Sequence, residues 1–106
     1  MQKFGLQRNS SSRHSALELE IAREQASALG RTGRKLRLSL EAYQSSLDHD
    51  LSSQHKNKQL TEIANNVWAL LLQREFIGFV EGNLVWVRSN YIIPEQAISM
   101  LGKQTY

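Results

Sequence analysis

Apolar residues recur at alternating spacings of three and four along the N-terminal half of the chain, a pattern typical of one helix packed lengthwise on another. A capping-box sequence, Ser15 to Glu18, precedes this pattern and predicts a helix start near residue 16. The pattern ends before Asp50, so we expect one long helix over about residues 16–47. The positions that define this apolar seam are Leu19, Ala22, Ala26, Leu29, Gly33, Leu36, Leu40, Tyr43 and Leu47.

Two glycines within the expected helix allow two interpretations. Each costs about 1 kcal/mol relative to Ala inside a helix, and Gly30 could instead be the left-handed residue that ends one helix before another begins. We favour a continuous helix because Gly33 and Ala26 lie on the seam, where a missing or small side chain lets another backbone approach closely.

Polar residues 48–58 predict a loop, and the apolar face that follows them predicts a second helix. This face extends from Leu60 to Leu72 and is broad enough to need cover on more than one side. We therefore expect the second helix, ending near Glu75, to be the most buried element, with Trp68 enclosed between the long helix and the segment that follows.

A change of period after the second helix predicts β-structure. Residues 76–80 and 84–88 are β-rich runs separated by a Glu-Gly-Asn sequence, which together predict a hairpin. Pro94 and Glu95 then fit the first turn of a last short helix that ends near Leu101. The expected fold is mostly α: a long N-terminal helix packed on a shorter apolar helix, followed by a small β-hairpin and a short C-terminal helix.

The chain has 106 residues, too few for two ordinary domains. Residues 1–14 are polar and Ser-rich without either hydrophobic period, so we expect a flexible tail there and a single helix-rich domain over residues 15–106. The longest apolar run, residues 67–72, is too short to cross a membrane, and the N-terminus lacks an apolar signal core. We therefore expect a soluble, cytoplasmic protein.

The residue types exclude several chemistries. With no Cys, the chain has no thiolate metal site and no cysteine nucleophile, and it contains neither a nucleophile elbow nor a Gly-rich phosphate loop. The sequence Asp48-His49-Asp50 is interpreted as a solvated loop, and Glu75 beside Arg74 as a structural ion pair. We expect no enzyme activity, no cofactor, no bound metal and no small-molecule substrate.

Positive charge is concentrated in the first third of the chain. Residues 1–37 carry eight Lys or Arg and three Glu, whereas residues 38–106 carry five Lys or Arg and seven Asp or Glu. Four of the basic residues form a cluster, and they suggest one alternative function, a small nucleic-acid-binding protein that contacts phosphates. The possible phosphate-binding residues are Arg31, Arg34, Lys35 and Arg37.

Our main hypothesis is a non-enzymatic helical interaction module that self-associates. The seam is about 42 Å long, whereas the expected second helix is about 27 Å long, so part of the seam needs cover from outside the chain. A second copy would supply this cover, and we expect a coiled-coil-like homodimer rather than a nucleic-acid partner. The expected interface residues are Leu19, Ala22, Ala26, Leu29, Gly33, Leu36 and Leu40.

Four segments of the chain form a recognisable combination: Ala28-Leu29-Gly30-Arg31-Thr32-Gly33-Arg34, Val67-Trp68, Gln73-Arg74-Glu75 with Gly78, and Arg88-Ser89-Asn90-Tyr91-Ile92-Ile93-Pro94. Together they resemble an uncharacterised family of short bacterial proteins known only as a domain of unknown function. The resemblance covers roughly residues 15–102 and implies one intact domain, with no activity, cofactor or partner attached to it.

Overall fold

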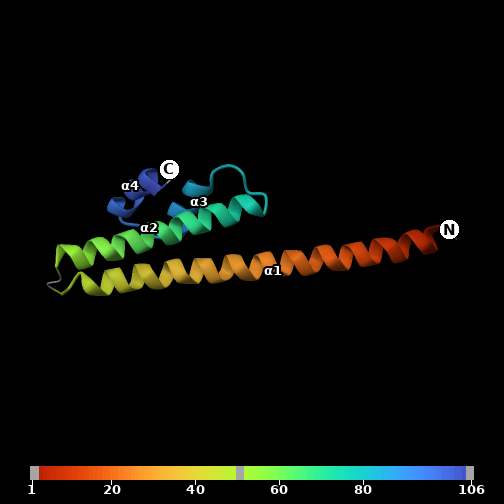
Figure 1. Cartoon of the computed structure of the whole chain (residues 1–106), viewed down its shortest axis with the longest axis horizontal. Helices are drawn as coiled ribbons and strands as arrows, with labels where there is room; N and C mark the ends of the chain where they lie inside the picture. The colour runs from red at the N-terminus through yellow and green to blue at the C-terminus, as the bar shows by residue number, and fades with distance from the viewer. Residues whose placement is uncertain (1–2, 50–51, 105–106) are drawn as a thin grey trace.

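The computed structural model describes the backbone of residues 3–49 and 52–104 and the side chains of residues 14–49 and 52–101. Within these ranges the secondary structure is entirely helical, so the expected β-hairpin is wrong. Four helices follow one another along the described chain (Figure 1): α1 (Lys3–Ser46), α2 (Ser53–Phe76), α3 (Asn83–Asn90) and α4 (Glu95–Gln104).

Helix α1 is much longer than the helix that packs against it. It continues through Gly30 and Gly33, which confirms the continuous helix, and it includes residues 3–14, where composition predicts a flexible tail. Its 44 residues extend about 66 Å, whereas the 24 residues of α2 extend about 36 Å. Because α2 runs antiparallel beside the C-terminal part of α1, the N-terminal part projects alone (Figure 1), and the molecule measures 73 × 24 × 23 Å.

The hydrophobic core lies where α2 meets the other three helices. Leu36 is the fully buried contribution of α1, Val87 that of α3 and Ala97 that of α4. Trp68 is only partly buried at the edge of this core, contrary to expectation, because it lies on the flank of α2 beside the inward-facing rows. The buried apolar residues of α2 are Leu60, Ile63, Ala64, Val67 and Leu70.

Polar contacts fix how α1 and α2 lie against each other. The Asn66 side-chain nitrogen donates to the Ser39 hydroxyl over 3.1 Å, and the Ser46 hydroxyl donates to Gln59 Oε1 over 2.8 Å. Asn66 is buried, so its side-chain nitrogen would lose its partner on α1 if the helices slid along each other.

Helix α2 begins earlier than the polar composition of residues 48–58 predicts. Ser52 is its N-cap, and the Ser52 hydroxyl accepts a hydrogen bond of 3.1 Å from the backbone N–H of His55. The expected loop is therefore shortened, and α2 covers more of the seam than the sequence estimate allows.

The segment after α2 ends one helix and begins the next, and this is why no hairpin forms. The N–H of Gly78 donates to the Glu75 carbonyl and the N–H of Phe79 donates to the Arg74 carbonyl, the paired bonds of a Schellman motif. Gly78 has φ of 109° there, which glycine adopts readily. Gly82, with φ of 70°, is the N-cap of α3.

Residues 84–88 are rich in β-branched side chains, yet tertiary packing makes them helical. Asn83 and Val87 are buried and Tyr91 is partly buried, which is the four-residue spacing of one helix face. A strand would place Val85 on the same face as Val87, but Val85 is 70% exposed. The expected last helix is confirmed as α4, with Glu95 in its first turn.

Candidate binding groove between helices α1 and α3

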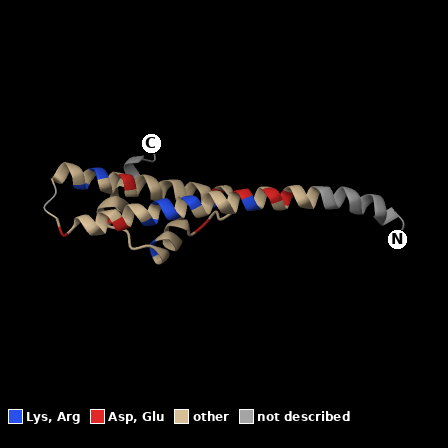
Figure 2. Ribbon diagram, turned by 90° about the horizontal axis from the view of Figure 1, so that it is seen from below, with Lys and Arg blue, Asp and Glu red and all other residues tan. Residues whose placement is uncertain are grey.

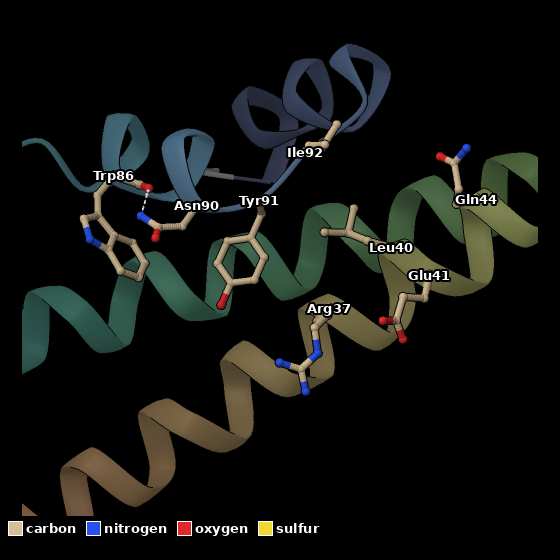
Figure 3. Close-up of a pocket in the computed structure, with 8 residues that line it drawn as sticks. All are labelled: Arg37, Leu40, Glu41, Gln44, Trp86, Asn90, Tyr91 and Ile92. Carbon is tan, nitrogen blue, oxygen red and sulfur yellow. Dashed lines mark hydrogen bonds between the residues drawn. The ribbon is translucent and has the colours of Figure 1, made fainter.

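An open groove runs between the C-terminal half of α1 and the segment formed by α3 and the residues after it. It consists of two adjoining hollows, of about 590 and 380 Å³, which share Arg37, Trp86 and Tyr91 in their walls. The α1 wall extends from Ala26 to Gln44, about 27 Å along the helix. Figure 3 shows the larger hollow, with Trp86 and Tyr91 facing α1 from above and Arg37 below them.

Tyr91 reaches across to α1 because Gly33 leaves room for it. A Cβ atom at Gly33 would lie 2.9 Å from the Tyr91 hydroxyl oxygen, closer than ordinary van der Waals contact. A Cβ atom at Gly30 would meet nothing within 4 Å. The glycine on the seam therefore admits a side chain from the end of α3 rather than the backbone of another helix.

The indole of Trp86 is held in place from its far side by Arg74. The Arg74 guanidinium carbon lies 3.7 Å from the Trp86 ring centroid and 4.5 Å from that of Phe79, so the cation contacts both rings. Trp86 also makes an edge contact with Tyr91, with ring centroids 6.5 Å apart at 66°. These contacts leave 39% of Trp86 exposed at the groove.

Arg74 is a buried cation whose partners are neutral. Its Nε donates to Asn83 Oδ1 over 2.9 Å, and the Asn83 amide in turn donates to the Phe79 carbonyl. Arg74 is 8% exposed while Glu75 is exposed, so the ion pair expected between these neighbours is wrong. The two point to different sides of α2, as adjacent helical residues do.

The four basic residues expected to form one phosphate site are divided between two sides of α1. Arg34 and Arg37 line the groove, and neither forms an ion pair within the described side chains. Arg31 instead approaches Glu24 at 3.9 Å and hydrogen-bonds Ser27, and Lys35 shares its side of the helix. Figure 2 shows the basic positions along the middle of α1.

The family of this chain is one of unknown function. The family model DUF6665, described as a family of unknown function, matches residues 5–105. The chain belongs to this family. Its match confirms the uncharacterised family that the sequence resembles, and it includes most of the projecting part of α1. No match to a curated protein or to a solved structure was found for this DUF6665 chain.

The seven seam residues expected to form an interface in this DUF6665 chain differ in their burial. Gly33 and Leu36 are buried by the chain's own helices, and Leu29 and Leu40 are partly buried. Leu19, Ala22 and Ala26 are exposed: Leu19 and Ala22 lie on the projecting part of α1, whereas Ala26 lines the smaller hollow of the groove.

The sequence indicates the basic wall of the groove but not its aromatic wall. The hairpin predicted over residues 76–88 places Trp86 in a strand and Tyr91 in the segment after it. The signals that could have found them are Gly78 directly after an apolar helix and the spacing of four that links Asn83, Val87 and Tyr91.

Neither a metal-binding cluster nor a membrane-spanning helix is found among the described residues. No three of their His, Asp and Glu side chains come together as a metal site would require, and Asp50 of the Asp-His-Asp sequence lies outside these residues. No described helix has the length and apolarity needed to span a membrane.

Proposed function

We propose that this protein is a non-enzymatic helical interaction module that self-associates as a homodimer through the projecting part of α1. The observation that supports this most strongly is the exposure of the seam beyond the end of α2: Leu19 is 51% exposed. Leu17 and Ile21, two positions before and after it in the sequence, are 55% and 50% exposed. In this proposal the protein acts in the cytoplasm, an expectation that rests on the sequence alone.

The exposed apolar residues spread over slightly more than half of the helix circumference. At 100° per residue, Leu17, Ile21, Ala22 and Leu19 span about 200°, and the remaining arc carries Glu20, Arg23 and Glu24. Covering a half-exposed Leu or Ile stabilises by about 1 kcal/mol. Because a symmetric dimer covers each position twice, the apolar residues on the seam side of both copies favour association.

The end of α2 extends this apolar surface. Phe76, 85% exposed, and Ile77 form an apolar notch of about 220 Å³ with Gln25 and Ala28 of α1. A partner helix lying on the exposed seam would continue the line of α2 and end against this notch. The notch therefore marks how far toward the C-terminus a partner can extend.

This geometry favours an antiparallel pair. If the partner's α1 lies along α1 from residue 27 back to residue 3, the two helices overlap over residues 3–27, with their midpoint at Ser15. Residues 3–13 carry Lys3, Arg8 and Arg13 without an acid, whereas residues 18–24 carry three Glu and one Arg. The antiparallel overlap places each basic stretch beside the partner's acidic stretch.

Light scattering on a matched pair of variants tests self-association. Leu19→Glu places a charge in the proposed interface, which costs about 3 kcal/mol or more, a loss of about 100-fold in association. Leu38→Glu is the control, because Leu38 is 56% exposed on the same helix but off the seam. We expect twice the monomer mass for the wild type and Leu38→Glu, and the monomer mass for Leu19→Glu. A monomeric wild type at tens of micromolar would contradict the proposal.

A further inference from the structure

The groove between α1 and α3 combines positive charge on one wall with aromatic rings on the other. Arg34 and Arg37 lie one helical turn apart on α1, and Trp86 and Tyr91 come from the opposite wall. The one acidic residue in the walls of these two hollows is Glu41, in the larger one. The stretch beside Arg34 therefore has a net positive charge.

These groups are available to a ligand because contacts within the protein leave the two arginines without ion pairs among the described side chains. Arg74, on the far side of the indole, bonds a neutral amide. Arg74 and the contact with Tyr91 fix the orientation of the Trp86 ring before any ligand binds. A fixed ring loses little conformational entropy when a ligand stacks on it.

We propose that this groove binds single-stranded nucleic acid, with phosphates on Arg34 and Arg37 and a base stacked at Trp86. Single strands are recognised by this combination of a basic groove and exposed aromatic rings. A duplex keeps its bases inside its own stack and cannot offer them to rings set in a groove. An acidic protein segment would use the guanidinium groups but has no general need of the ring faces.

Trp86 fluorescence measures this binding directly. In a Trp68→Phe variant, Trp86 is the only indole, and an oligothymidylate of about 12 nucleotides, within the usual range of site sizes, serves as the probe. We expect saturable quenching of the indole emission by the stacked base. For two phosphate contacts on a single strand, the logarithm of the binding constant should fall against the logarithm of salt with a slope of about −1.4.

A pair of charge-matched double variants separates the groove from general electrostatic attraction. Arg34→Gln/Arg37→Gln removes two charges from the groove and should weaken binding about 25-fold at ~0.1 M salt, the value of two such contacts. Arg31→Gln/Lys35→Gln removes two charges from the other side of the same helix and should change binding less than about twofold. Circular dichroism of both variants checks that the helices are intact.

Three results would overturn the proposal. One is the absence of quenching at ~50 mM salt; another is equal weakening by the two double variants, which would indicate non-specific attraction. The third is displacement of the oligothymidylate by poly-glutamate at equal charge concentration, which would identify an acidic protein ligand instead. Binding should also survive in the Leu19→Glu variant, so a failure of self-association and a failure of this proposal are distinguishable.

Discussion

The two halves of α1 continue the same apolar seam, but only one of them is covered by the rest of the chain. Leu36, in the C-terminal half, is 0% exposed under α2, whereas Leu19, in the N-terminal half, is 51% exposed. Both occupy seam positions, and α1 is continuous between them. A seam pattern therefore specifies that a helix has an apolar side, but the length of the partner helix decides how much of that side is covered within the chain.

The largest expected contrast between the two halves is in stability. Leu36→Ala removes a fully buried side chain and should lower the free energy of unfolding by about 2–5 kcal/mol. Leu19→Ala should change the stability of the monomer by less than about 0.5 kcal/mol, because it removes an exposed side chain. Urea unfolding at sub-micromolar concentration, where association is weakest, compares the two. Equal losses would show that the projecting half is covered within one chain.

A smaller effect is expected at the boundary between the halves, where the two glycines lie. Gly30→Ala should stabilise by about 1 kcal/mol, because it improves helix propensity and meets no neighbour. Gly33→Ala should stabilise less or destabilise, because its Cβ would press on the Tyr91 hydroxyl. In a Tyr91→Phe background, which lacks this hydroxyl, thermal unfolding should show that the two substitutions change the stability by similar amounts. If the two substitutions still differ in their effect on stability in that background, the strain at Gly33 does not come from the Tyr91 hydroxyl.

The fold could be predicted from the sequence wherever a period extends over many residues. The seam and the apolar face of residues 60–72 indicate α1, α2 and their packing, and the Pro-Glu sequence indicates α4. Residues 84–88 are too short for periodicity to separate helix from strand, and their β-branched side chains favoured the wrong choice. Helix formation there depends on tertiary contacts, which include the burial of Val87 and the contacts of Arg74 with Phe79 and Trp86.

For the same reason, only the basic wall of the groove could be predicted from the sequence. The basic residues are close together along α1, so spacing alone brings Arg34 and Arg37 to one side. Tyr91 lies 58 positions from Gly33 in the sequence, and only the packing of α3 on α2 brings its hydroxyl against α1. Contacts between residues so far apart in the sequence leave no recognisable pattern in the local sequence.

A cysteine substitution at Ser15 tests the antiparallel arrangement without an expected effect on stability. The chain has no native Cys, and residue 15 is at the midpoint of the proposed overlap, so Ser15→Cys should form a disulfide-linked dimer under mild oxidation. Ser45→Cys, exposed at the other end of α1, is the control and should remain uncrosslinked. The extent of crosslinking is measured by non-reducing gel electrophoresis. Crosslinking at residue 45 and not at residue 15 would contradict the antiparallel overlap.

Amide hydrogen exchange at two protein concentrations tests most directly whether the projecting half of α1 is the self-association surface. An isolated helix exchanges rapidly, and helical amides are protected when tertiary or intermolecular packing stabilises them. We expect protection of residues 14–27 to rise between low-micromolar and high-micromolar protein, while protection of residues 28–46 stays constant. In Leu19→Glu the concentration dependence should disappear. Protection of residues 14–27 that is independent of concentration in the wild type would contradict the account.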